Sequence, residues 1–129
     1  MKKIVSSSDA PKAIGPYSQA VCFKDLVFTS GQLPLIPETM NFPSSCVKEQ
    51  TRESLTNLKV VLEKGGSSLK SVLKTTCFLV DMDDFAAFNE VYTEFFGTEG
   101  APARSCFAVA KLPKGALVEI EAIAFVERP

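Results

Sequence analysis

Residues 118–126 form an alternating segment that reads Val118-Glu119-Ile120-Glu121-Ala122-Ile123-Ala124-Phe125-Val126. Successive side chains of a β-strand point to opposite faces of a sheet, so one face of this segment is entirely apolar. The other face mixes Glu119 and Glu121 with Ile123 and Phe125. We expect the apolar face to lie beneath helices. The mixed face is not typical of a solvated surface, and we expect it to meet another subunit.

Two segments have the helical period that would supply this cover. Within residues 46–64, apolar side chains recur at helical spacing, and the two glycines at 65–66 end the segment. A second stripe, made of Phe and Tyr side chains, occupies residues 85–96. It is preceded by the acidic run 81–84, which suits a helix N-terminus, and it is stopped by Gly97.

Six short apolar segments are predicted to be strands. They are residues 2–5, 19–23, 26–32, 72–80, 103–110 and 117–126. The second and third are separated only by Lys24-Asp25, which is typical of a β-hairpin. Two helices against one mixed sheet predict an α+β fold, a two-layer sandwich with both helices on one face. The length fits a single domain over residues 1–129.

The amino-acid composition limits the kinds of functional site that the chain can form. The chain carries a net charge of −1 and has four cysteines but no histidine. No C-x-x-C pair is present, which argues against a zinc site. Without histidine, acid–base chemistry must use carboxylates, tyrosine, lysine or cysteine. The net charge also provides no long-range attraction for nucleic acid.

The sequence contains no membrane or export signal that we can identify. No apolar run approaches the roughly 18 residues that a membrane span needs. Residues 1–9 contain two lysines but no apolar stretch behind them. We therefore expect no signal peptide, a cytoplasmic location and reduced thiols.

Arg104 and Glu119 are two residues that could carry chemistry. A guanidinium is a rigid fork that binds a carboxylate through two hydrogen bonds, although Arg104 paired with Glu119 or Glu121 on the surface is the simpler alternative. Apolar neighbours can raise the pKa of a carboxyl such as Glu119 and so let it move protons or orient water; a solvated strand residue is the usual alternative. We expect Arg104, Cys106 and Glu119 to share one sheet face, in a partly buried polar site at a subunit contact.

Five other residues are candidates for lining that site. Tyr17, in a Gly-Pro turn, can donate a hydrogen bond to a substrate, unless it is a buried anchor. Ser30 and Gly31 close an apolar strand, where a hydroxyl and bare backbone can line a pocket. Asn89 lies among the aromatic residues of the second helix and would otherwise cap the helix or face solvent. Cys106 has no histidine to activate it, so we expect it to pack rather than to act as a nucleophile.

Several short motifs, taken together, have a family resemblance that extends from about residue 10 to residue 126. They include Ile14-Gly15-Pro16-Tyr17-Ser18-Gln19-Ala20, Phe28-Thr29-Ser30-Gly31-Gln32-Leu33-Pro34, Asn89-Glu90-Val91-Tyr92, Pro102-Ala103-Arg104-Ser105-Cys106 and Val118-Glu119-Ile120-Glu121-Ala122. The combination resembles the reactive-intermediate deaminase family, also called YjgF-like or L-PSP proteins. The arginine after Pro-Ala makes the chain most similar to the RidA-like subgroup.

The resemblance implies a chorismate-mutase-like α+β fold and a homotrimer with active sites between subunits. It implies hydrolysis of 2-aminoacrylate and 2-aminocrotonate to 2-oxo acids and ammonia, a reaction that needs no metal or bound cofactor. By motif position, Arg104 would hold the substrate carboxylate and Glu119 would position or activate water. The cleft would be lined by Tyr17, Ser30, Gly31, Asn89 and Cys106.

Two alternatives remain at this point. Some members of the family are described as endoribonucleases or translation inhibitors, but the net charge and the absence of histidine argue against RNA cleavage. The same cleft would also serve a non-enzymatic, ligand-binding or chaperone-like trimer, because binding a carboxylate and turning it over both require Arg104.

Overall fold

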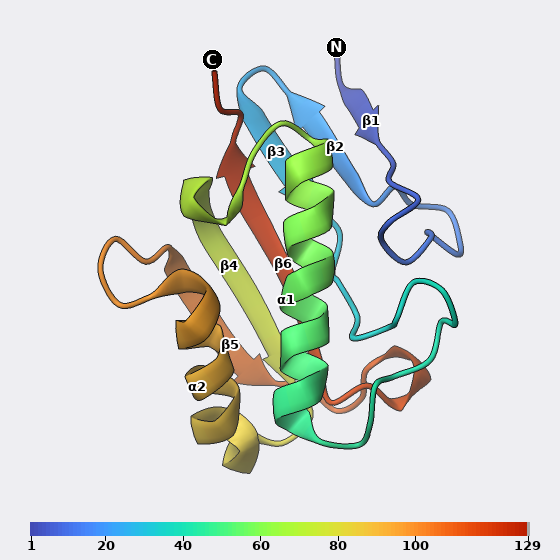
Figure 1. Cartoon of the computed structure of the whole chain (residues 1–129), viewed down its shortest axis with the longest axis vertical. Helices are drawn as coiled ribbons and strands as arrows, with labels where there is room; N and C mark the ends of the chain where they lie inside the picture. The colour runs from blue at the N-terminus through green and yellow to red at the C-terminus, as the bar shows by residue number, and fades with distance from the viewer. Residues whose placement is uncertain (129) are drawn as a thin grey trace.

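The computed structural model describes residues 1–128, and its six strands form one sheet with both helices on one face (Figure 1). The strands are β1 (Lys3–Val5), β2 (Ala20–Phe23), β3 (Leu26–Thr29), β4 (Val72–Leu79), β5 (Ala103–Ala108) and β6 (Val118–Phe125). The helices are α1 (Val47–Lys64) and α2 (Phe85–Phe96), with short 3-10 turns at Leu69–Ser71, Met82–Asp84 and Pro113–Gly115. The predicted α+β two-layer sandwich is confirmed.

The sheet is mixed, in the order β1-β2-β3-β6-β4-β5. All neighbours run antiparallel except β4 and β5, which are parallel and are connected through α2. A parallel pair needs such a crossover, because the chain must return to the edge from which it started. β5 is therefore an edge strand, whereas β6 lies in the interior of the sheet between β3 and β4 (Figure 1).

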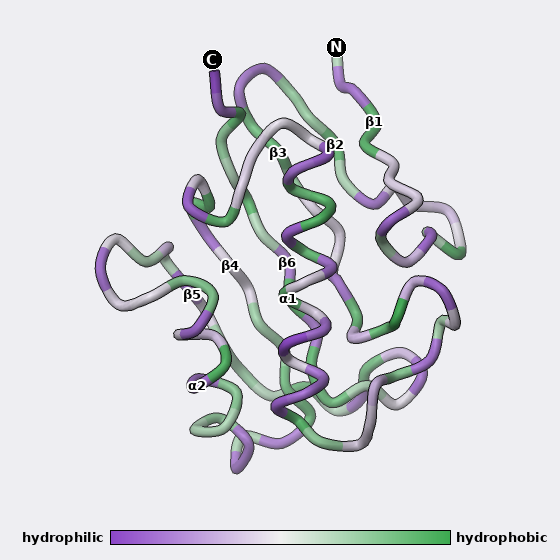
Figure 2. The backbone as a smooth tube through the Cα atoms, in the orientation of Figure 1, coloured by the Kyte–Doolittle hydropathy of each residue, from purple (hydrophilic) through white to green (hydrophobic). Residues whose placement is uncertain are grey.

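The core lies between the helices and the apolar face of β6, as the alternation predicted. Val118, Ile120, Ala122 and Ala124 are buried, and they belong to one core with the fully buried leucines and Val61 of α1. Hydrophilic and hydrophobic residues follow each other around the turns of α1 (Figure 2), which is the pattern of a helix with one face on a core.

In the described part of the chain, the other face of the sheet has no helix over it and carries large apolar side chains. Phe28, Phe107 and Phe125 are 37%, 47% and 42% exposed. The ring of Phe107 packs edge-to-face on Phe78, with centroids 5.3 Å apart. Exposed aromatic rings gathered on one sheet face mark a surface suited to contact with another protein.

The expectation that Arg104, Cys106 and Glu119 share one sheet face is wrong. β5 pairs with β4 so that Arg104 lies opposite Thr75, which is buried beneath the helices. Glu119 lies opposite Phe78, on the uncovered face. The alternation of side chains within each segment was predicted correctly. Which residues of β5 and β6 share a face, however, depends on how each strand pairs with β4.

The strands are slightly shorter than predicted. The segment expected to run to Gln32 leaves the hairpin after Thr29, and Gln32 instead forms an isolated bridge with Ile120 of β6. The last two strands lose one or two residues at their ends. Within residues 1–128, neither helix is long and apolar enough to cross a membrane.

Candidate functional site

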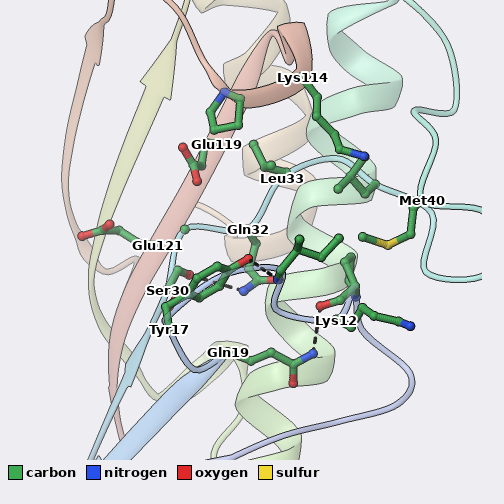
Figure 3. A pocket seen from close by; sticks show the side chains of 15 residues that line it. Lys12, Tyr17, Gln19, Ser30, Gln32, Leu33, Met40, Lys114, Glu119 and Glu121 are labelled. Atoms are coloured by element: carbon green, nitrogen blue, oxygen red, sulfur yellow. Dashed lines mark hydrogen bonds between the residues drawn. The ribbon is translucent and has the colours of Figure 1, made fainter.

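A cavity of about 570 Å³ opens beside the end of β3 and the start of β6 (Figure 3). Four of the predicted site residues line it: Tyr17, Ser30, Gly31 and Glu119. Its remaining wall combines apolar side chains with polar and charged ones: Pro11, Ile14, Leu33, Leu35, Met40 and Pro113 with Lys12, Gln19, Gln32, Lys114 and Glu121. The structure therefore brings together four of the seven predicted site residues.

Gly31 lies directly against the carboxylate of Glu119. The bridge that places it there consists of two backbone hydrogen bonds, from Gln32 N to Ile120 O at 2.8 Å and from Ile120 N to Gln32 O at 3.3 Å. A Cβ atom on Gly31 would lie 2.7 Å from Cδ of Glu119, well inside van der Waals contact. Only glycine leaves room for the carboxylate in this position.

Burial raises the pKa of Glu119 above its ordinary value of 4.5, and the neighbouring charge of Glu121 raises it further. Both side chains point from the same face of β6 and both line the cavity. The predicted raised pKa is supported, and the solvated alternative is not, because the carboxyl is half-buried. A carboxyl of this kind exchanges protons closer to neutral pH than an exposed one.

Tyr17 and Ser30 are held at the cavity by backbone contacts. The hydroxyl of Ser30 donates to Ser18 O, and its amide donates to Gln19 O at 2.9 Å. Tyr17 is 52% exposed, so it is not the buried anchor of the alternative interpretation. Its hydroxyl accepts only a long hydrogen bond, 3.4 Å, from Ile14 N and remains able to donate.

The cavity wall also depends on residues that the sequence analysis missed. Asn57, buried on α1, donates to Leu33 O at 3.0 Å and to Leu35 O at 2.8 Å, and so fixes that wall to the helix. Lys114 reaches the cavity from a turn in which its own φ is +59°. An Asn facing the core within an apolar helical stripe was the signal for the first; in the sequence, Lys114 beside Pro113 is most simply a solvated loop charge.

Arg104 belongs to a second cluster, beneath α2. Its Nη1 donates to Asn89 Oδ1 at 2.7 Å. Its guanidinium carbon lies 4.6 Å from the ring centroid of Tyr92 and 5.4 Å from that of Phe85. Phe85, Asn89 and Tyr92 follow one another at positions i, i+4 and i+7 of α2, which places them on one face of the helix. This spacing was visible in the sequence, but its relation to Arg104 was not.

Within residues 1–128, no ion pair joins Arg104 to an acidic side chain. The alternative in which it pairs with Glu119 or Glu121 is therefore wrong. The bond to Asn89 uses one arm of the guanidinium and leaves further N–H donors of the fork for an anion. Partial burial and stacking on aromatic rings give this cation a fixed orientation.

Cys106 lies on the same side of β5 as Arg104 and packs against the core. Burial raises the pKa of its thiol above 9.0, and Arg104 only partly opposes that effect. Burial likewise raises the pKa of the neighbouring Cys77 thiol to about 12. Thiols with raised pKa values are poor nucleophiles at neutral pH, which supports the packing role predicted for Cys106.

The predicted residues thus form two clusters. Tyr17, Ser30, Gly31 and Glu119 line the cavity, whereas Arg104, Asn89 and Cys106 lie on the helix-covered side of the sheet and take no part in that cavity. Among the described residues, no group of three His, Cys, Asp or Glu side chains is arranged to hold a metal ion. One cluster can bind an anion and the other can exchange a proton.

Comparisons of the sequence and of the structure with known proteins agree on one protein family. Residues 7–126 match the family model described as Endoribonuclease L-PSP. The chain is 49% identical over 127 residues to a RutC family protein of Pyrococcus horikoshii, covering 98% of this chain and 100% of the relative. It is 48% identical to Reactive Intermediate Deaminase A, chloroplastic, of Arabidopsis thaliana, covering 95% and 65%. The crystal structure of Escherichia coli TdcF with bound serine is 46% identical, with a TM-score of 0.91 over 97% of this chain and 99% of that one.

Proposed function

The chain belongs to the Endoribonuclease L-PSP family, and from this premise we propose that it is a deaminase of reactive enamine and imine acids. The substrates in this proposal are 2-aminoacrylate and 2-aminocrotonate, with their imine tautomers, and the products are 2-oxo acids and ammonia. One observation carries the proposal: a guanidinium fork with no acidic partner in the described chain is matched by a half-buried carboxyl of raised pKa. The relative named Reactive Intermediate Deaminase A and the crystal structure of TdcF with bound serine support this proposal.

We further propose a homotrimer in which neighbouring subunits complete the site. The two clusters lie on opposite faces of the sheet of one chain, so Arg104 and Glu119 cannot act on one small substrate within that chain without a large rearrangement. The exposed rings of Phe28, Phe107 and Phe125 provide an apolar contact surface for a second subunit. Closed rings of identical subunits join different surfaces of the same chain, as this arrangement requires.

In the proposed reaction, Arg104 binds the substrate carboxylate and fixes the imine carbon beside the cavity. The carbon is already electrophilic, so no covalent intermediate with the protein is needed. Ionised Glu119 accepts a proton from the water that attacks this carbon and returns it to the nitrogen, which gives a carbinolamine. Glu119 then takes the proton of the new hydroxyl group and passes it to the nitrogen, so that the C–N bond breaks, the C=O bond of the 2-oxo acid forms and ammonia leaves. The raised pKa of Glu119 suits both steps, because it makes the carboxylate a stronger base than an exposed one.

The remaining residues have supporting roles in this proposal. Tyr17 can donate its phenolic hydrogen to the substrate, since its hydroxyl has no other strong partner within residues 1–128. Gly31 keeps the Glu119 carboxylate in the cavity, and Asn89 holds one arm of Arg104. The side chains supply carboxylate binding and proton transfer themselves, and we propose that the reaction uses no cofactor.

The proposal is tested by generating 2-aminoacrylate with a serine dehydratase and following the release of pyruvate and ammonia. The protein should accelerate release over the spontaneous rate, and Arg104→Ala should remove the acceleration while thermal unfolding stays cooperative. Two charge-assisted hydrogen bonds of about 1.5–3 kcal/mol each would lower kcat/KM by at least about 100-fold. Arg104→Lys should restore little, because an ammonium lacks the fork.

RNA cleavage by the same preparation provides the comparison, since the family model carries an endoribonuclease description. Wild-type rates of pyruvate release from the Arg104→Ala protein would contradict the proposal. So would nuclease activity that depends on Arg104 without any acceleration of deamination.

A further inference from the structure

Arg104 contacts side chains of α2, and a buried hydrogen bond next to Arg104 connects α2 to the sheet. The hydroxyl groups of Thr75 and Tyr92 are 2.8 Å apart and share a hydrogen bond. Thr75 is 0% exposed and Tyr92 is 5% exposed. Thr75 is also the residue that lies opposite Arg104 in the pairing of β4 with β5. The three residues therefore connect β4, α2 and β5 around the guanidinium.

The two ends of Tyr92 have different partners. Its ring stacks against Arg104 and also contacts Phe88 and Phe96, with centroids 5.6 and 4.7 Å away. Its hydroxyl is directed to Thr75. Burial raises the pKa of the phenol above 10.0, so the hydroxyl stays protonated at neutral pH. A hydroxyl that is buried, protonated and already bonded to Thr75 has no access to a substrate.

We propose that the hydrogen bond between Thr75 and Tyr92 is a positioning contact for Arg104, which sets the ring plane on which the guanidinium stacks and thereby the direction of its free donors. This inference rests on the proposed carboxylate binding by Arg104. A two-point bond to a carboxylate depends on the direction of the fork, and a fork held in place before binding loses less freedom when the substrate arrives. Asn89 fixes one arm of the guanidinium, and the Tyr92 ring fixes its plane.

A purely structural role makes a different forecast, and a pair of nearly isosteric changes separates the two. Thr75→Val or Tyr92→Phe alone leaves one buried hydroxyl without its partner, which destabilises the fold. The double variant removes both hydroxyls and leaves neither unpaired. Its stability should return towards wild type, whereas the orientation of Arg104 should not.

The experiment measures thermal unfolding, kcat and KM for generated 2-aminoacrylate, and the Kd of pyruvate as a stable 2-oxo acid. We expect about a tenfold rise in KM and in the pyruvate Kd for both single variants and for the double variant, with a smaller change in kcat. Thr75→Ser keeps the hydroxyl and should stay close to wild type in KM and in the pyruvate Kd. Thr56→Val, which removes an exposed hydroxyl from α1, is the matched control.

Wild-type KM and pyruvate Kd in the double variant would overturn the positioning role, as would an equal loss in Thr75→Ser and Thr75→Val. Arg104→Ala, measured in the same assays, keeps the two proposals apart. If it retains turnover, the proposed site is wrong. If it loses turnover while the double variant binds pyruvate normally, only the positioning contact is wrong.

Discussion

Mixing two inactive variants should restore activity if the site is shared between subunits. Arg104→Ala removes the carboxylate-binding group and keeps Glu119, and Glu119→Gln does the reverse. In the proposed trimer, each site takes its arginine from one subunit and its glutamate from a neighbour. A site is therefore intact when the arginine comes from a Glu119→Gln subunit and the glutamate from an Arg104→Ala subunit.

The expected magnitude follows from the arrangement of the two clusters. In an equal mixture assembled at random, each requirement is met half of the time, so about one quarter of wild-type activity should return. Each variant alone should be at least about 100-fold slower than wild type. The assay unfolds the two proteins together in denaturant, refolds them, and measures pyruvate release per subunit against wild type treated in the same way.

A second mixture provides the control. Wild type refolded with an equal amount of the double variant, Arg104→Ala with Glu119→Gln, should give about one quarter of the activity if the site is shared, and about one half if each chain acts alone. Light scattering on the refolded samples establishes whether trimers form. No recovery in the first mixture, with one half in the second, would refute the shared site.

Five further results are expected. Glu119→Gln should be at least as stable as wild type at pH 7. The raised pKa means that the folded state holds the Glu119 proton more tightly than the unfolded chain, so wild-type stability falls as pH rises from the ordinary 4.5 through the raised value. Glutamine removes that loss, and thermal melts across this pH range test the expectation. The acid limb of wild-type kcat/KM should have its midpoint above 4.5, and a midpoint at or below that value would contradict the assignment of Glu119 as the base. Gly31→Ala should lower kcat at least about tenfold with little change in melting temperature, because the new Cβ displaces the Glu119 carboxylate; an unchanged rate would show that this carboxylate position is not required. Cys106→Ser should keep most of the activity, and activity should survive exhaustive chelation; a covalent adduct on Cys106, or turnover restored by added metal, would contradict these two expectations.

The layered architecture could be predicted because it depends on patterns within single segments. The alternation in 118–126 and the helical stripes in 46–64 and 85–96 each identify one face of one element, and burial follows from them. The hairpin around Lys24 was equally local, and Lys24 adopts the positive φ that its tight turn requires.

The division of the site could not be predicted in the same way. Whether Arg104 and Glu119 share a face depends on how β5 and β6 each pair with β4, and this pairing joins residues far apart in the chain. The motifs marked the candidate residues, but a motif carries no information on sheet faces. Asn57, Tyr92 and Lys114 were missed for a related reason, since their roles depend on backbone groups or side chains contributed by distant segments.

The interior place of β6 has a consequence for the synthesis of the protein. β6 is made after the other five strands, yet it lies between β3 and β4 and joins the two halves of the sheet (Figure 1). Until it leaves the ribosome, the first three strands and the pair β4–β5 have no strand between them, and their facing edges are unpaired. We therefore expect nascent chains that lack β6 to be protease-sensitive and to recruit chaperones, with cooperative folding only after translation has passed Phe125.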